Sequence, residues 1–378
     1  MVILGIKMPS NENTFCNGLD ISQGNRILYP DILRILAVFA VMTLHVCGSG
    51  FYSNPVQSFA WQVVNFYECL VRWAVPVFVM VSGIFFLNPQ KEITLSKLYR
   101  KNIFRIVVAL VAWGLFYKSL SISIMFFVDE VSDKDLVTRI LKEGATFVFG
   151  HAWLHLWFLY MIIGLYMLVP LIRVFTTHAT KKHYHYLFVL YFLFGSLLPF
   201  FQDSLLLFDN RLKIYFSIKE LMGFTGYFIL GYYLFRYDIS HRIKKWIYVL
   251  AGLSVIVQIF GTVFISYKLG AANELLYKNF RPNVVIQAVA VYIFIKDCFI
   301  SKKLSERTKK LIFLFSKCSF GMYLVHDAFN IVFARIGFTV AVINPFFAIP
   351  LRTVATFILS FGVIWVLGRI PGIKKYCM

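Results

Sequence analysis

The stretch RILAVFAVMTLH, residues Arg34–His45, places a permanently charged guanidinium and a titratable imidazole at the two ends of an apolar segment. It belongs to a longer apolar run, Ile32–Gly50, and a helix needs about 20 such residues to cross the hydrocarbon core of a bilayer. An ionisable side chain inside such a segment is costly in free energy and is therefore a candidate for function. This stretch thus indicates both a membrane fold and a site within it.

The composition points to the same class of protein. Of the 378 residues, 59% are hydrophobic and 15% are charged, whereas a soluble domain carries about 25% charged residues. We predict an all-α, polytopic membrane helical bundle with about ten transmembrane helices. The expected cores of these spans are Ile32–Gly50, Leu70–Leu87, Ile106–Val128, Trp153–Ile172, Tyr184–Gln202, Leu221–Phe235, Trp246–Tyr267, Pro282–Ile295, Ser319–Ala334 and Pro345–Gly368.

The formal net charge of +20 comes from basic residues that gather in alternate loops, as is typical of loops that stay in the cytoplasm. This pattern predicts that both termini are cytoplasmic, that the partner is a lipid bilayer and that no nucleic acid is bound. The chain divides into a cytoplasmic N-terminal tail, residues 1–26, and a ten-helix membrane domain, residues 27–378. The tail has no long apolar segment followed by a cleavage site, so we expect the first span to act as an uncleaved anchor.

The six cysteines show no CxxC spacing. Cys47 and Cys69 could meet near one membrane face, but free buried thiols are the preferred interpretation. The histidines form no metal-ligand pattern and no phosphate-binding glycine loop is present, so we expect neither a bound metal nor nucleotide hydrolysis.

Arg34 and His45 lie on nearly one face of the first expected helix. A spacing of eleven residues gives about 16 Å of rise and about 20° of rotation beyond three turns, so the two side chains differ mainly in depth. Asp31 lies three residues before Arg34 and can pair with it. Two structural alternatives stay open: Arg34 could anchor the helix at the cytoplasmic interface, and His45 could be a hydrogen-bonded histidine packed between helices.

Residues 29–45, YPDILRILAVFAVMTLH, resemble the opening of the acyltransferase-3 family of integral membrane proteins. In that family the first span begins with an Asp, then an Arg and, after ten intervening residues, a His, and Asp31, Arg34 and His45 match this pattern. Four later segments are similar to further landmarks of the family in the same order: PVFVMVSGIFFL (Pro76–Leu87), HLWFLYMIIGLYMLVPLI (His155–Ile172), YFILGYYL (Tyr227–Leu234) and SFGMYLVHD (Ser319–Asp327). The resemblance covers the chain from about Tyr29 to its C-terminus.

The resemblance implies a stand-alone sugar O-acetyltransferase. Such proteins move an acyl group, commonly acetyl, from cytoplasmic acyl-CoA to a hydroxyl of an extracytoplasmic or lipid-linked sugar, such as a polysaccharide of the cell envelope. It implies acetyl-CoA or another acyl-CoA as co-substrate, a carbohydrate acceptor and no permanently bound cofactor. The expected location is a cell membrane, which the protein crosses many times, and the plasma membrane of a bacterium in particular. The sequence gives no indication of the oligomeric state.

Arg34, Arg100 and Arg105 are the candidates for binding the donor on the cytoplasmic side, because guanidinium groups bind phosphates bidentately. The resemblance also assigns Asp31 to the site, beside Arg34. Family members often carry a tighter Arg-x-x-Arg pair after the second span, whereas Lys101 lies between Arg100 and Arg105 here. The alternative for Arg100 and Arg105 is ordinary positive charge on a cytoplasmic loop.

His45 is the candidate catalytic base, because an imidazole exchanges a proton near neutral pH and general-base catalysis contributes about 10²–10⁴-fold. His155 and Trp157 could hold the sugar near the outer face, although Trp is also frequent in the interfacial belts of membrane proteins. His326 lies near mid-depth and is equally compatible with a functional and a structural role. Asp327 follows it, but successive residues point apart on a helix, so an orienting pair is not expected.

A transporter or flippase of a polar lipid or glycan precursor is the alternative function, because ten spans with buried charges also suit such proteins. Secondary transporters are commonly built from two related halves. The sequence shows no convincing internal repeat, and acyl transfer is therefore the preferred interpretation.

Overall fold

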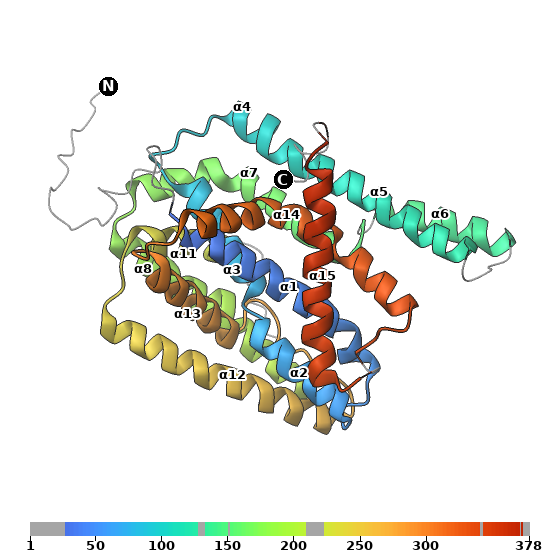
Figure 1. The fold of residues 1–378 in the computed structure, drawn as a ribbon. Coiled ribbons are helices and arrows are strands. Elements are labelled where there is room, and N and C mark those ends of the chain that lie inside the picture. Colours follow the sequence, from blue (N-terminus) through green and yellow to red (C-terminus); the bar gives the residue numbers. More distant parts are fainter. Residues whose placement is uncertain are drawn as a thin grey trace.

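The computed structural model describes residues 27–127, 133–149, 152–208, 223–340, 343–370 and 372. Every regular element within these residues is a helix, and eight helical segments among them are long and apolar enough to cross a membrane. The prediction of an all-α, polytopic membrane protein is therefore confirmed. Figure 1 shows α1, α3 and α14 inside the bundle, with α12 along its side.

In chain order the elements are α1 (Tyr29–Ser53), α2 (Phe59–Val71), α3 (Ala74–Leu87), α4 (Leu95–Lys97), the π-helix η1 (Leu98–Ile103), α5 (Phe104–Phe127), α6 (Asp133–Phe149), the 3₁₀ helix η2 (Leu154–Leu156), α7 (Trp157–His178), α8 (Lys181–Leu190), the π-helix η3 (Tyr191–Leu197), α9 (Leu198–Phe208), α11 (Thr225–Arg236), α12 (His241–Leu269), α13 (Pro282–Phe299), α14 (Glu306–Arg335) and α15 (Pro345–Leu367).

Two of the ten expected spans are not among these eight segments. Leu221–Phe235 corresponds to α11, which has 12 residues within the described part of the chain. Ser319–Ala334 lies inside α14, a continuous helix of 30 residues. That helix begins with several basic residues and carries His326 and Asp327 further along, so it is less apolar than the other long helices. Both α11 and α14 nevertheless pack within the bundle (Figure 1).

The second expected span, Leu70–Leu87, is a pair of helices that breaks at a turn formed by Arg72 and Trp73. Pro76 explains the break, because a proline has no N–H to donate to the carbonyl four residues earlier, which here is the carbonyl of Arg72. Helix α2 also extends eleven residues further towards the N-terminus than the prediction, to Phe59. The break leaves the charged Arg72 side chain inside a segment that is otherwise apolar.

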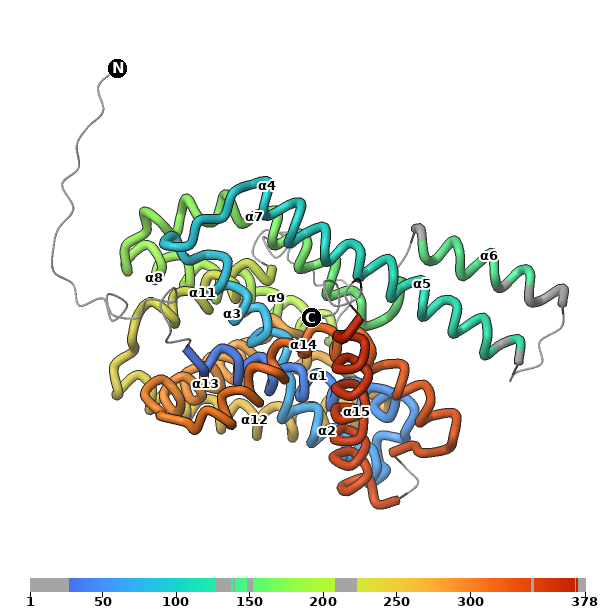
Figure 2. Tube along the Cα trace, turned by 45° about the horizontal axis from the view of Figure 1, so that its top comes forward, coloured from blue at the N-terminus to red at the C-terminus, as the bar shows by residue number. Residues whose placement is uncertain are grey.

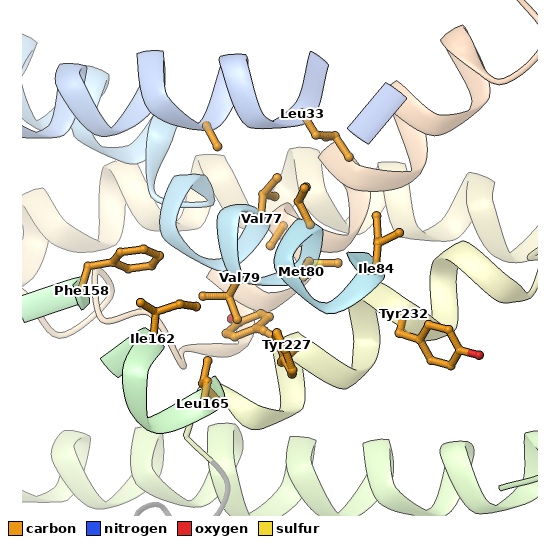
Figure 3. Close-up of a cluster of buried hydrophobic side chains, with 14 of the residues drawn as sticks. Leu33, Val77, Val79, Met80, Ile84, Phe158, Ile162, Leu165, Tyr227 and Tyr232 are labelled. Carbon is orange, nitrogen blue, oxygen red and sulfur yellow. The ribbon is translucent and has the colours of Figure 1, made fainter. Parts of the chain in front are cut away.

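Helix α3 forms the centre of the core. Figure 3 shows Leu33 of α1 on one side of α3 and Phe158, Ile162 and Leu165 of α7 on the other. Tyr227 and Tyr232 of α11 approach from a third direction. Because α3 is surrounded, ten of its 14 residues are buried. This explains why its sequence is apolar on every face rather than amphipathic.

Two glycines allow α3 and α11 to cross at very short range. A Cβ atom added to Gly83 of α3 would lie 1.9 Å from the carbonyl oxygen of Phe228, and one added to Gly231 of α11 would lie 2.0 Å from that of Met80. Small residues at a helix crossing let backbones approach in the absence of a hydrophobic driving force between helices. The close crossing therefore explains why a glycine follows Ser82 in the sequence of α3.

Helix α12 has the polarity of a lipid-facing helix. It buries a polar row of Ser254, Gln258, Thr262 and Ser266. The Nε2 atom of Gln258 donates to the carbonyl oxygen of Leu276 at 3.1 Å, and Gln287 of α13 donates to Oε1 of Gln258 at 2.8 Å. Between Ile247 and Ser266 its exposed side chains are apolar, and they include Leu253, Ile256, Val257, Phe260 and Phe264. Polar groups inside and hydrocarbon outside are the arrangement that a bilayer stabilises.

Two basic side chains, those of Arg173 and Lys296, bind helix ends. Arg173 of α7 donates to four carbonyl oxygens around the C-terminus of α3, those of Phe86, Asn88, Pro89 and Lys91, at 2.8–3.4 Å. Lys296 of α13 donates to the carbonyl oxygen of Leu234 at the end of α11 at 2.7 Å. Cations favour the C-termini of helices because the last carbonyls there lack partners.

Helices α5 and α6 form a hairpin that projects from the bundle in both views (Figures 1 and 2). Lys118 of α5 forms an ion pair with Glu143 of α6 and donates to Oγ1 of Thr146 at 2.8 Å.

The four cysteines among the described residues, Cys47, Cys69, Cys298 and Cys318, are free thiols. This confirms the interpretation that Cys47 and Cys69 are not bridged, while Cys16 and Cys377 lie outside the described residues.

Candidate active site

Three histidines from separate parts of the chain meet inside the bundle. The ring centroid of His45 on α1 lies 4.9 Å from that of His326 on α14 and 6.0 Å from that of His155 on η2. The rings of His155 and His326 lie 4.8 Å apart. His155 and His326 are at most 1% exposed. Sequence analysis proposed each residue separately, and the fold gathers them into one cluster.

The tautomer of His326 follows from its neighbour. Its Nδ1 atom lies 2.6 Å from the carbonyl oxygen of Tyr323, one turn earlier on α14. A carbonyl oxygen only accepts hydrogen bonds, so Nδ1 must carry the hydrogen. The Nε2 atom is buried and has no hydrogen-bond partner among the described residues. A neutral His326 therefore presents an unused lone pair inside the cluster.

His155 is held at three points. Its Nε2 atom donates to the carbonyl oxygen of Leu324 at 3.3 Å, and its own carbonyl oxygen accepts from the hydroxyl of Tyr323. Its Nδ1 atom lies 3.7 Å from Oδ2 of Asp327, which also accepts from Nε1 of Trp153 at 2.6 Å. Asp327 thus interacts with His155 on another element, in agreement with the expectation that it would not orient its neighbour His326.

A cavity of about 680 Å³ lies near the N-terminal end of α1, at Arg34. Four cationic side chains line it: Arg34, Arg105, Lys310 and Lys317. None of the described residues that line it is acidic. The remaining wall contains aromatic residues and short polar side chains such as Ser82, Asn102 and Ser319. A cavity with this charge and size is suited to an anionic ligand.

Arg34 is fixed in this cavity by its neighbours. Its Nη1 atom donates to Oγ of Ser316 at 3.4 Å, and Ser316 in turn donates to Oδ1 of the buried Asp31 at 2.5 Å. The guanidinium also lies 5.1 Å from the ring centroid of Phe85. Asp31, which sequence analysis paired with Arg34, therefore connects to it through Ser316.

A much smaller pocket of about 30 Å³ lies at His45. His155, Trp157 and Tyr323 line it together with apolar side chains from α1, α3 and α7, namely Val38, Val41, Val75, Phe78 and Phe158. Phe78 and Phe158 also line the large basic cavity. The two cavities are therefore neighbours that share two aromatic walls.

Of the predicted donor residues, the structure brings Arg34 and Arg105 into the basic cavity, where Arg105 lies 5.4 Å from the ring centroid of Phe320. Arg100 is exposed on η1 and does not line the cavity. Of the residues predicted for the acceptor side or for support of the site, Trp157 and His155 line the small pocket. The rings of His155 and His326 both lie beside the ring of His45.

Sequence analysis missed two groups of residues. Lys310 and Lys317 line the basic cavity. They are seven residues apart, which places both on one face of α14, and this spacing was the available signal in the sequence.

Glu68 of α2 is 2% exposed and forms an ion pair with Arg72, whose guanidinium lies 4.1 Å from the ring centroid of Tyr277. A Glu and an Arg four residues apart within an apolar run were the available signal.

The described residues contain no group of three or more His, Cys, Asp or Glu side chains arranged to hold a metal ion. The three histidines are packed through their rings, and the described ring contacts and hydrogen bonds account for their positions. The cluster is thus equipped for proton transfer by imidazole groups.

Comparison with known proteins agrees with the resemblance seen in the sequence. No curated protein and no solved structure matched the chain. A family model described as an acyltransferase domain matches residues 27–369, which is nearly all of the described chain and includes every residue of the histidine cluster and the basic cavity. The chain therefore belongs to the acyltransferase-3 family and is a membrane acyltransferase.

Proposed function

We propose that the protein moves an acyl group, in particular acetyl, from cytoplasmic acyl-CoA to a hydroxyl of an extracytoplasmic or lipid-linked sugar. The observation that carries this proposal is the pair of neighbouring cavities, one with four cations and one with the histidine cluster, that share Phe78 and Phe158. In this arrangement each substrate enters its own compartment, and only the acyl group needs to pass from one to the other.

The basic cavity supports acyl-CoA as the donor. Coenzyme A carries a 3′-phosphate and a pyrophosphate, and Arg34, Arg105, Lys310 and Lys317 supply four cations that can bind them. The volume of about 680 Å³ lies within the range of about 300–1,000 Å³ that ligand pockets occupy. Phosphates bound at this level would direct the pantetheine arm along α1 towards His45.

The histidine pocket supports base catalysis of the transfer. The oxygen of the acceptor hydroxyl attacks the thioester carbonyl carbon while His45 accepts the hydroxyl proton. A tetrahedral oxyanion forms, then collapses, and the C–S bond breaks with its electron pair leaving on sulfur. His45 returns the proton to the departing thiolate. The products are a sugar ester and free coenzyme A, and His45 ends as it began.

His326 and His155 are suited to assist His45 rather than to replace it. The lone pair on Nε2 of His326 is free to accept a hydrogen bond from the imidazolium that His45 becomes. The carboxylate of Asp327 beside His155 adds a negative charge near the cluster, which favours that imidazolium. We therefore assign His45 as the catalytic base and His326 as its positioning partner.

The face of α1 beyond His45 supports entry of the acceptor from the other side. A Cβ atom added to Gly48 would meet nothing within 4 Å, and Ser49 is exposed. These residues lie three and four positions after His45 and so share its face. Trp157 at the small pocket offers an aromatic surface for a sugar ring. We place the donor side in the cytoplasm of a bacterial cell and the acceptor side outside its plasma membrane.

The test uses purified full-length protein in lipid nanodiscs with acetyl-CoA radiolabelled in the acetyl group. Candidate acceptors are a lipid-linked sugar and a cell-envelope polysaccharide. Transfer of label to the sugar is the expected result, and His45→Ala should abolish it while His241→Ala, a change at an exposed histidine at the start of α12, should not.

A parallel experiment in sealed vesicles addresses the transporter alternative. Movement of a lipid-linked sugar across the bilayer without any covalent change, together with no label transfer, would overturn the proposed reaction. Label transfer without sugar movement would support it.

A further inference from the structure

Two phenyl rings stand between the small pocket at His45 and the basic cavity. Phe78 of α3 and Phe158 of α7 line both spaces, and their ring centroids lie 5.4 Å apart in an edge-to-face arrangement. Phe158 is 6% exposed and also contacts the ring of Tyr323 at 5.6 Å. The two phenyl rings thus form an aromatic partition between the cations and the histidines.

The backbones that carry this partition are firmly held. The backbones of α3 and α11 are in close contact where the two helices cross at Gly83 and Gly231. Figure 3 shows Phe158 and Ile162 projecting from α7 towards α3. Phe78 and Phe158 thus project from two helices, α3 and α7, that pack against each other in the same close-packed core.

We propose that Phe78 and Phe158 set the length of the acyl group that the enzyme transfers, admitting acetyl and excluding longer chains. This inference rests on the proposed function. For the thioester carbonyl to reach His45, the acyl group must occupy the pocket of about 30 Å³. A cavity needs about 10–15 Å³, measured in the same way, to hold one water molecule, so this pocket has room for about two water-sized groups, the size of an acetyl group. Val38, Val41 and Val75 line the pocket beside these two rings, and the other lining residues are His45, His155, Trp157 and Tyr323.

The expected selectivity is steep because the walls are packed. A hydrophobic pocket of fixed size discriminates between substrates that differ by one methylene by about 10- to 200-fold. Acetyl and butyryl differ by two methylenes, so wild-type kcat/KM should be at least about 100-fold higher for acetyl-CoA than for butyryl-CoA. Removing one phenyl ring would join the pocket to the larger cavity and make room for the longer chain.

The test measures kcat/KM for acetyl-, propionyl-, butyryl- and hexanoyl-CoA with one sugar acceptor. In Phe158→Ala the ratio of acetyl to butyryl transfer should fall at least tenfold, because butyryl transfer rises relative to acetyl transfer. Phe260→Ala is the matched control, since Phe260 lies on α12 and is 67% exposed. A defect in folding would lower transfer from all four donors equally, so it would not change the ratio.

A second variant covers the case in which Phe158→Ala does not fold. Val75→Ala removes less volume from the same pocket and should shift the preference from acetyl towards propionyl. Wild-type protein that transfers butyryl within a few-fold of acetyl would overturn the inference while leaving the proposed function intact. An unchanged ratio in both variants would overturn it as well. Wild-type protein that transfers no acyl group at all would instead overturn the proposed function, and the inference with it.

Discussion

The Nδ1 atom of His326 lies 2.6 Å from the carbonyl oxygen of Tyr323, which leaves Nε2 as the unprotonated nitrogen of a neutral ring. The Nε2 atom has no hydrogen-bond partner among the described residues, although it is buried beside His45. Leaving a buried polar atom unpaired costs about 1–3 kcal/mol. A protein that retains such an atom at the centre of a histidine cluster is expected to use it.

Replacing His326 tests this use. Asn at position 326 can place an amide N–H near the position of Nδ1 and keep the bond to Tyr323, but it has no atom in the position of Nε2. We expect His326→Asn to insert normally and to lose about 10²-fold or more in kcat, within the range that proton-transfer groups contribute. Single-turnover transfer from labelled acetyl-CoA is the measurement. Activity close to that of the wild type would reduce His326 to a packing residue.

His45→Ala is expected to lower acyl transfer by about 10²–10⁴-fold, because the variant lacks the group that accepts the hydroxyl proton. The amount of protein in the membrane and its elution in detergent should match the wild type, since His45 is only partly buried. Binding of acetyl-CoA, measured by isothermal calorimetry, should persist. A variant that fails to bind the donor would indicate that His45 supports the fold rather than the chemistry.

Lys310→Ala and Arg105→Ala should each raise the KM for acyl-CoA by about 10- to 100-fold, because a hydrogen bond to a charged group contributes about 1.5–3 kcal/mol. Lys303→Ala and Arg100→Ala are matched controls, since both residues are exposed and neither lines the basic cavity. With 3′-dephospho-CoA thioesters, the variant that has lost the 3′-phosphate contact should show no further increase in KM. Equal effects of the controls would mean that only the overall surface charge matters.

Gly83→Ala should destabilise the bundle severely, because the new Cβ would lie 1.9 Å from the carbonyl oxygen of Phe228 and the backbone cannot yield. The loss should exceed the cost of about 1–3 kcal/mol that is typical of overpacking a core. Gly164→Ala on α7 is the control, because its added Cβ would meet nothing within 4 Å. Thermal unfolding in detergent gives the comparison, and similar melting temperatures for the two variants would contradict the close crossing of α3 and α11.

The melting temperature of the protein should respond differently to single and double substitutions of the ion pair between Glu68 and Arg72, at the break between α2 and α3. Glu68→Gln leaves Arg72 without its buried counter-charge, and breaking a buried pair costs about 3–5 kcal/mol. Changing Glu68→Gln and Arg72→Met together removes both charges and should recover much of the melting temperature. If the double variant is less stable than either single variant, the two residues do not act as a pair.

The sequence was sufficient for the fold class and for α1, because apolar runs and helical spacing are local properties. It placed Arg34 and His45 on one face at different depths, and the structure finds them lining neighbouring cavities. It could not place His155 and His326 against His45, since periodicity says which face of a helix is buried but not which other helix it meets. The contacts of His155 depend on the short η2 turn, which carries no periodic signal.

The donor residues illustrate the same limit. Arg100 and Arg105 are five residues apart, and a π-helix over Leu98–Ile103 precedes the helix that carries Arg105. The two side chains point in different directions, so that Arg105 lines the cavity and Arg100 is exposed. Lys310 and Lys317 were counted only as cytoplasmic charge. Their role depends on α14 running beside α1, a contact between segments almost 300 positions apart in the chain.

The inward polar row of α12 has a consequence for protein engineering. Gln258 binds both the loop before α13, at Leu276, and the side chain of Gln287, so amide groups help to attach this helix to the bundle. Deleting the segment His241–Leu269 would leave the carbonyl oxygen of Leu276 and the amide of Gln287 facing acyl tails without these partners, and detergent tails could not replace them. The smallest useful fragment for crystallisation or grid preparation must therefore retain the segment His241–Leu269 together with the loop that it holds.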